Sequence, residues 1–413
     1  MKHVSSAIDR ARRTRFRRVG SVGLLLVAGS TPSLTTFTGA RPAWGQERTA
    51  LIEYTDAETA HRAGPDDLRL RVGGADGADL YAVTDILPRS DGSFVVVNRG
   101  TSELYLFDSS GAHLWSAGQS GHGPGEFTDI SHVALLPGDS LAVLDALARR
   151  VSLFDPDGDF VESFPLEPPF EGAGFATLLV ALADGTLLIG HSEGTMDPRP
   201  EAVYFRQRIF RYSTAGERLS TEGLSIPRSE HFVQAVPERF GRVAYWDLAF
   251  GRRMTVRPSP DGGLFIGDGT EWTVERRTVD GTVSATHRLL RAIEPVTAAD
   301  RAAHRSRLFE GETGPRREMI AKLAEEMPYP ATRPAYRRFE VDDAGRLWLE
   351  AYASPAADVG ALWIRLDPGT GTSAGVRFPP RYRAFAFRGD FVYGIWRDDL
   401  DIEYVHVYTT ESM

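Results

Sequence analysis

Polar side chains follow four apolar runs of similar sequence in this chain, at Asn98, Asp145, His191 and Asp268. Carboxylate, amide and imidazole groups bind polar ligands, and they are also the groups that hold calcium or zinc in proteins. We therefore predict a ligand-binding cluster made of these four residues and five neighbours, Arg99, Arg150, Tyr352, Trp396 and Arg397. The alternative is that each Asp or Asn hydrogen-bonds its own loop, as short polar side chains do at strand ends.

Motifs that would assign a catalytic residue are missing from the sequence. The glycine-rich stretch 118–125 lacks the Gly-x-Gly-x-x-Gly order of a dinucleotide loop, and the acidic turn 155–159 has Leu166 where a calcium loop needs glutamate. There are no cysteines, which excludes disulfides, thiolate metal sites and a cysteine nucleophile. We predict no catalytic residue, no metal ligand and no cofactor, with calcium or zinc as the ions that a polar cluster could hold.

Charge is unevenly distributed along the 413 residues. Residues 1–45 carry eight Lys or Arg and one acid, whereas the remainder carries 39 basic and 55 acidic residues, a net charge of −16. A body this acidic is a poor partner for a nucleic-acid backbone, whose binding depends on positive potential and counterion release. We exclude nucleic acid as a partner.

Residues 1–45 have the order of an export signal: a basic stretch, an apolar run over 19–29, and small residues at Ala43 and Gly45. The apolar run has eleven residues, and a helix needs about 20 to cross a bilayer. We predict a signal peptide at 1–45, no stable membrane span after its removal, and a periplasmic or secreted protein. Retention of the segment as an anchor is the alternative.

The rest of the chain contains an internal repeat, which decides the fold prediction. A glycine turn separates two short apolar strands six times, at Gly92, Gly138, Gly185, Gly262, Gly345 and Gly389. A second turn follows in the first five copies, so each copy is a meander of four antiparallel strands. The sixth copy reaches Met413 one strand short. The alternating segment 67–72 could supply that strand and close a ring.

We therefore predict an all-β, six-bladed β-propeller over residues 67–413, with a linker at 46–66. The first turns are 46, 47, 77, 83 and 44 residues apart, and a four-stranded blade needs about 40–45. The two long intervals must hold insertions. One is predicted as a loop at Ser192–Ala202. The other, 297–335 between blades four and five, predicts two helices, the first capped by Thr297 and the second bearing an apolar stripe.

The repeats LYLFDSSG and VSLFDPDG, the loop GHGPGEF at 121–127 and the segment YRRFEVDDAGRLWLE at 336–350 resemble bacterial exported six-bladed propellers of the NHL-like or TolB-like type. The resemblance extends over about residues 67–410 and is strongest in blades one, two and five. It implies a propeller fold and an extracytoplasmic location, and it does not imply one activity.

Both predicted insertions fall on the face that carries the loops between second and third strands. We expect this face to bind a peptide, a protein or a small polar ligand without catalysis. The alternative is a metal-dependent hydrolase, lactonase or lyase in the central channel, which convergence of Asp85, Asp129, Asp145 and His191 would favour. A purely structural envelope protein, with an apolar channel, is the third option.

Overall fold

The computed structural model describes residues 49–57, 59–74, 79–198, 203–235, 243–355 and 359–411. The chain divides into two units, Met1–Glu47 and Arg48–Met413, and the description below concerns the second. The export signal predicted at 1–45 lies outside the described residues.

The second unit is a six-bladed β-propeller. Blades one and two are four-stranded, with β4 (Val83–Pro88), β5 (Phe94–Asn98), β6 (Glu103–Phe107) and β7 (His113–Ala117), then β8 (His132–Leu135), β9 (Leu141–Asp145), β10 (Arg150–Phe154) and β11 (Phe160–Pro165). Blade three has five strands, β12 (Ala176–Ala181), β13 (Leu187–Pro198), β14 (Val203–Tyr212), β15 (Leu224–Ala235) and β16 (Val243–Asp247).

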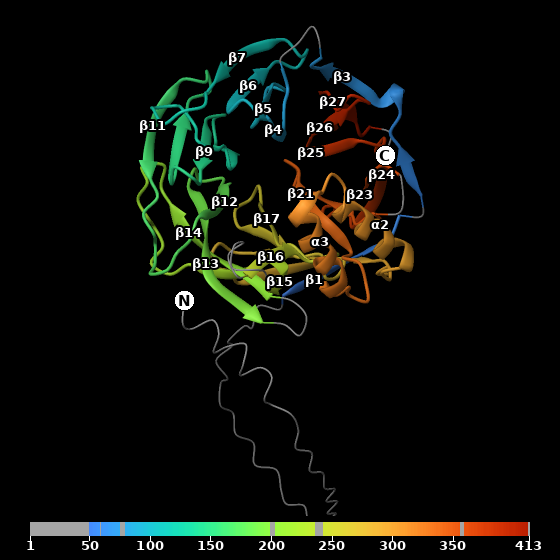
Figure 1. Ribbon diagram of the computed structural model, residues 1–413. Helices are drawn as coiled ribbons and strands as arrows, with labels where there is room; N and C mark the ends of the chain where they lie inside the picture. Colours follow the sequence, from blue (N-terminus) through green and yellow to red (C-terminus); the bar gives the residue numbers. More distant parts are fainter. Residues whose placement is uncertain are drawn as a thin grey trace, which may run out of the picture. The chain divides into compact units, whose positions relative to one another are not determined.

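Blades four to six contain the rest of the strands. Blade four has β17 (Thr255–Pro258), β18 (Leu264–Gly267), β19 (Thr273–Arg277), β20 (Val283–Leu290) and β1 (Ala50–Thr55), and blade five has β21 (Tyr336–Val341), β22 (Leu347–Ala351), β23 (Leu362–Asp367), β24 (Thr372–Arg377) and β2 (Ala60–Arg62). Blade six has β25 (Tyr382–Arg388), β26 (Phe391–Arg397), β27 (Glu403–Thr409) and β3 (Leu68–Val72). The first strands of successive blades contact one another around the ring, and β25 contacts β4 (Figure 1).

Ring closure follows the predicted scheme. Strand β3 pairs antiparallel with β27, with Val72 opposite Val405 and Leu70 opposite Val407. Figure 1 shows β3, in blue, beside the red strands of the C-terminus. The N-terminal strand thus completes a blade that the C-terminal sequence leaves one strand short, which confirms the architecture.

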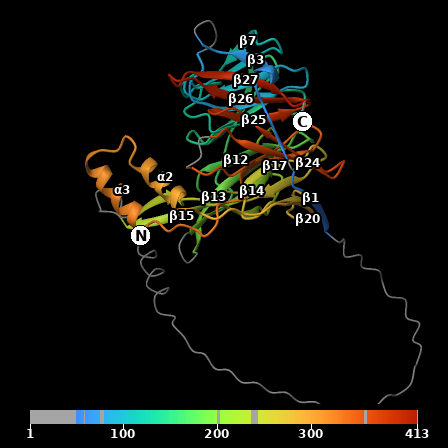
Figure 2. The same ribbon diagram turned by 90° about the vertical axis from the view of Figure 1, so that its right-hand side faces the viewer.

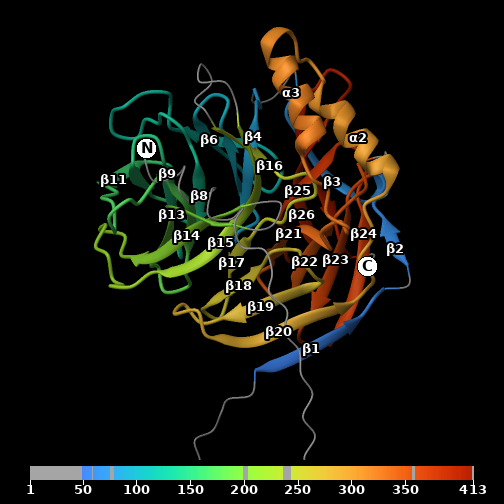
Figure 3. The ribbon, with the colours of Figure 1, turned by 60° about the horizontal axis from the view of Figure 1, so that its bottom comes forward.

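The segment expected to be a linker differs from the prediction. Within 46–66, β1 and β2 add parallel fifth strands to the outer edges of blades four and five, beside β20 and β24 (Figure 3). Tyr54 in β1 is fully buried and its hydroxyl is 2.9 Å from His287 Nδ1. These strands cover edges whose backbone groups would otherwise face solvent. The sequence over 46–66 has only short runs of mixed polarity, which do not predict strands, and this is why it reads as a linker.

Blade three also differs from its prediction. Strand β13 runs through Ser192 to Pro198 in place of the expected loop, with a register shift between Ser192 and Met196 that absorbs the glycine-containing stretch. Residues 199–202 of the predicted loop lie outside the described residues. The long strands β14 and β15 continue past the blade, and β16 pairs with β15 as a fifth strand.

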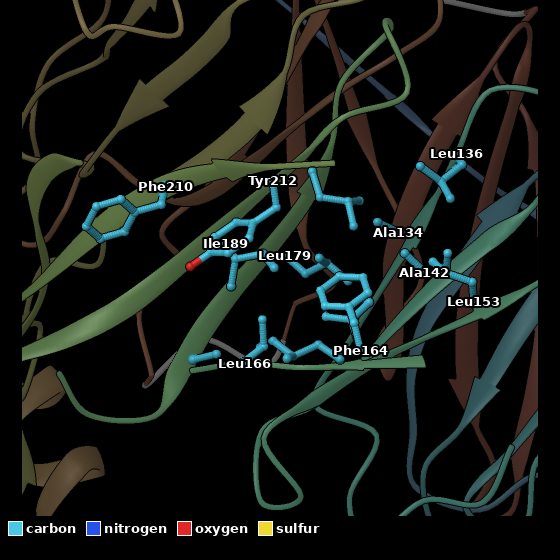
Figure 4. Close-up of a cluster of buried hydrophobic side chains, with 14 residues drawn as sticks. Ala134, Leu136, Ala142, Leu153, Phe164, Leu166, Leu179, Ile189, Phe210 and Tyr212 are labelled. Carbon is cyan, nitrogen blue, oxygen red and sulfur yellow. The ribbon is translucent and has the colours of Figure 1, made fainter. Parts of the chain in front are cut away.

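Each interface between neighbouring blades has its own apolar cluster. Between blades two and three, Leu144 and Val151 pack with Leu179, Ile189 and Phe210, part of the cluster shown in Figure 4. Five further clusters of this kind lie between the other pairs of blades. Burial of the alternating faces of two sheets explains why the strands read as apolar runs. The six predicted turn glycines all have positive φ, between 54° and 89°, as a tight turn requires.

Two helices, α2 (Ala298–Leu308) and α3 (Gly314–Glu326), connect β20 to β21. Thr297 caps α2: its hydroxyl accepts a hydrogen bond from the Asp300 amide, and the Asp300 carboxylate accepts one from the Thr297 amide. On α3, Ile320 and Leu323 are buried in a cluster with Phe250, from the connection between β16 and β17. Figure 2 shows both helices projecting from one face of the ring.

Candidate functional site

A cavity of about 540 Å³ opens where the first strands of blades three to six begin. Its walls come mainly from β12, β15, β17, β21, the start of β25 and the connection 248–254, with one residue each from β8, β14, β16 and β22. The lining is strongly basic, with seven arginines (Arg228, Arg252, Arg253, Arg257, Arg337, Arg338 and Arg383) and three acids (Glu230, Asp247 and Glu350). The protein as a whole is acidic, so its overall charge predicts a negative cavity. The positive charge of this cavity therefore comes from the way the fold gathers arginines at one place.

Four of these arginines are held by carboxylates. Arg257 donates to Glu340 Oε1 at 2.7 Å, and Arg338 donates to Glu350 Oε2 at 2.7 Å. Arg253 lies 3.2 Å from Asp247, and Arg252 lies 3.6 Å from Glu230. Fixed in this way, these guanidinium groups build the wall of the cavity.

The other three arginines, Arg228, Arg337 and Arg383, form no ion pair with any residue that the structure describes. Burial lowers the pKa of Arg228, and the nearby charge of Arg253 lowers it further. Burial likewise lowers the pKa of Arg383, with added repulsion from Arg338 and Arg337. The charges of Asp247 near Arg228 and of Glu350 and Asp85 near Arg383 oppose these shifts, but neither pKa returns to its ordinary value. Clustered cations that no carboxylate holds in an ion pair create a site that an anion would stabilise.

One side of the cavity is aromatic and rests on the helical insertion. The rings of Phe250 and Tyr352, both in the lining, have centroids 6.0 Å apart. Behind them, Phe250 contacts His304 of α2 and Tyr329, which follows α3. The insertion therefore supports the cavity wall, and the hydroxyl of Ser354, just beyond Tyr352, donates a hydrogen bond to Asp300, the partner of Thr297 in the α2 cap.

Two titratable groups on the first strands face the channel with perturbed pKa values. Burial and the nearby charge of Glu340 raise the pKa of Asp85 to about 7, against the opposing influence of Arg257. His132 is exposed to the cavity but enclosed by neighbouring blades, and this enclosure and the charge of Arg257 lower its pKa to about 4. The channel interior is therefore polar and not filled by apolar side chains alone.

The residues predicted from the ends of the second strands are placed separately, each in its own blade. Asn98 Oδ1 accepts from the Tyr81 amide, and its Nδ2 donates to Asp79 and Thr101. Asp145 accepts from the amides of Thr128 and Ala148. Both are fully buried. Their contacts are those of the alternative interpretation, in which the side chain orders its own loop.

The remaining predicted residues also have local partners. Arg99 binds Asp129, Arg150 donates to the carbonyls of His122 and Glu126, and Arg397 binds Glu403. Asp268 accepts from the Thr270 amide, His191 is buried beside Phe210 and Tyr212, and Trp396 stacks on His406. Of the nine, Tyr352 lines the cavity.

The cavity residues that the sequence did not predict lie on the first strands of five blades, on β15 and β16, and on the connection 248–254. The lining takes His132 from β8, Thr177 from β12, Arg257 from β17, Arg338 from β21 and Arg383 from β25. The sequence signal for the cavity residues on first strands is a charged or polar side chain in the apolar run before a glycine turn, as in YRRFEV and YRAFAF. The first strand of each blade lines the axis of a propeller. Aligning the six sequence repeats on their first strands, and not on their second strands, therefore identifies the residues that face the axis.

The sequence profile of a family described as "6-bladed beta-propeller" matches residues 82–172, which form the first two blades and the start of the connection to the third. No curated protein matches the sequence. Together with the six sheets, the profile supports the propeller fold.

Several solved structures are similar in outline. A protein of Bacteroides fragilis described as exported has 13% identity and a TM-score of 0.48, covering 87% of this chain and 99% of its own. Virginiamycin B lyase of Staphylococcus aureus has 10% identity, a TM-score of 0.41 and coverage of 79% and 94%. A gluconolactonase of Xanthomonas campestris has 14% identity, a TM-score of 0.38 and coverage of 86% and 98%. Likenesses this distant carry no information about the activity of this chain.

Two further facts concern the residues that the structure describes. No helix among them is long and apolar enough to cross a membrane. The same residues contain no group of three or more His, Asp or Glu placed to hold a metal ion.

Proposed function

We propose that this protein is an extracytoplasmic binding protein whose arginine-rich cavity takes a small organic or inorganic polyanion, such as a tricarboxylate or a phosphate compound. The observation that carries the proposal is the set of three arginines, Arg228, Arg337 and Arg383, that face the cavity without an ion-pair partner among the described residues. Arginine suits this role because its planar fork of donors matches carboxylate and phosphate oxygens.

The other walls support the same ligand class. The aromatic residues Phe250 and Tyr352 form an apolar part of the lining beside the polar groups, as is usual in binding pockets. The cavity volume of about 540 Å³ is in the range of small-molecule sites, about 300–1,000 Å³. A small ligand therefore fits better than a folded protein.

Binding of citrate and of pyrophosphate to the purified protein tests the proposal. We expect calorimetry to detect at least one of the two, with an affinity that falls as salt is raised. Arg383→Gln and Arg337→Gln should each weaken binding about 10-fold, because a hydrogen bond to a charged group contributes about 1.5–3 kcal/mol. Arg381→Gln is the matched control, since Arg381 is two residues away and pairs with Asp399 outside the cavity. Equal affinity in all three variants would contradict the proposal.

Extracytoplasmic location rests on the sequence at 1–45. Mass spectrometry of the protein recovered from a periplasmic or culture fraction should find a new N-terminus near residue 46. Recovery of the full-length chain in the cytoplasmic fraction would contradict the location without affecting the ligand proposal.

A further inference from the structure

Three side chains in the wall of the cavity, those of Ser229, His231 and Asp247, are arranged as a nucleophile, a base and an acid that orients the base. His231 on β15 lies directly opposite Asp247 on β16 in the strand register. Ser229 is two residues before His231 on the same strand, which places both side chains on one face of the sheet. All three residues line the cavity.

The distances match those roles. Ser229 Oγ and His231 Nε2 are 2.7 Å apart, within hydrogen-bond range. On the other side of the ring, His231 Nδ1 is 3.5 Å from Asp247 Oδ1 and forms no hydrogen bond with the residues that the structure describes. Hydrogen bonds between catalytic groups are often this long before a substrate is bound. The ring of Phe205 packs edge-on against the imidazole with centroids 4.5 Å apart and restricts its rotation.

The charge environment keeps the imidazole in its basic form. Burial lowers the pKa of His231, although Asp247 opposes the shift, and the nearby cations Arg228 and Arg253 lower the pKa further. A neutral imidazole at pH 7 can accept a proton from the serine hydroxyl. Ser229 is 5% exposed, so its hydroxyl meets bulk water only through the cavity.

We propose that Ser229, His231 and Asp247 form a nucleophilic hydrolase site for carboxylic esters that carry an anionic group. This inference rests on the proposed function, because the arginines of the same cavity would hold the anionic end of the substrate. Arg228 lines the same cavity and its charge acts on His231, so it would supply positive charge for the carbonyl oxygen that becomes negative.

The reaction takes two steps, with water as the second reactant. Ser229 Oγ attacks the ester carbonyl while His231 Nε2 takes the hydroxyl proton, and the tetrahedral adduct expels the alcohol, which receives that proton. A water molecule then attacks the acyl-serine and gives a proton to His231. Collapse of the second adduct releases the carboxylic acid and returns the proton to Ser229, which restores the starting state. Asp247 orients the imidazole and stabilises its cation in each step.

Mono-4-nitrophenyl adipate and the neutral 4-nitrophenyl hexanoate, with acyl chains of equal length, test the site. We expect release of 4-nitrophenolate with a higher kcat/KM for the adipate ester, and a fluorophosphonate adduct located on Ser229 by mass spectrometry. Ser229→Ala and His231→Gln should each lower kcat about 100-fold or more, and Asp247→Asn about 10-fold or more. Ser225→Ala is the matched control, because this serine is on the same strand and bonds Arg206.

Binding of citrate or pyrophosphate separates the two proposals. A Ser229→Ala protein that keeps anion affinity but loses esterase activity and labelling supports the hydrolase site and shows that the variant is folded. A wild-type protein that binds the anions but gives no adduct and no hydrolysis above the Ser229→Ala protein overturns the hydrolase site and leaves the binding function intact. Adduct formation on a residue other than Ser229 also overturns it.

Discussion

Asp85 makes the stability of this protein depend on pH in an unusual direction. Burial and the charge of Glu340 raise its pKa from 3.8 to about 7, while Arg257 and Arg338 oppose the rise. Below pH 4 the carboxyl is protonated in both the folded and the unfolded chain. Between about pH 4 and 7 the unfolded chain releases the proton and the folded chain keeps it, so the free energy of unfolding falls as pH rises.

The size of the effect follows from the shift. Three pKa units at about 1.4 kcal/mol each give an upper limit of about 4 kcal/mol. Asp85 is half-buried, and solvent screening reduces the effect, so we expect about 1–3 kcal/mol. Asp85→Asn should remove this cost, because the amide carries no charge and its oxygen can still accept the 2.9 Å bond from the Ile86 amide. The variant should match the wild type near pH 4 and be more stable at pH 8.

Urea unfolding followed by tryptophan fluorescence at several pH values between 4 and 8 measures this difference. Asp261→Asn is the control of opposite sign: this exposed carboxylate has a lowered pKa because it bonds Arg276 and Ser259, so its loss should reduce stability at high pH. A stability difference between Asp85→Asn and wild type that is constant with pH, or that favours the wild type at pH 8, would refute the reasoning.

Two further predictions concern the parts that build the cavity and close the ring. Thr297→Ala should lower the free energy of unfolding by about 1 kcal/mol, because the α2 cap is lost. Thr313→Ala should change it little, since Thr313 caps α3 without a side-chain hydrogen bond. Thermal unfolding compares the two variants, and equal losses of stability would contradict the role of the Thr297 cap. Val72→Ala should cost about 1–2 kcal/mol because Val72 is buried in the closing blade, whereas Val161→Ala on the exposed face of β11 should be nearly neutral. Similar urea midpoints for these two valine variants would argue against closure by β3.

Much of the architecture is encoded locally. Six glycine turns between apolar strands specify the blades, because the turns need positive φ and the strands bury both faces between neighbouring sheets. The alternating segment around Leu70 predicts a strand, and β3 is the strand that closes the last blade beside β27. By contrast, β1 and β2 pair in parallel with β20 and β24, which are distant in sequence. Short runs of mixed polarity do not predict pairing with such distant strands.

The cavity was decided by tertiary structure. Arg228, Arg337 and Arg383 come from three blades, and only the ring brings them together. Four of the first strands also contain register shifts, at Val83/Asp85, Ala176/Leu178, Tyr336/Arg338 and Ala384/Ala386. A shift of one residue reverses which side chains face the channel, so strict alternation along the sequence assigns them to the wrong side. The sequence determined the blades and their order, whereas the bulged inner strands and the closed ring decided which charges share one cavity.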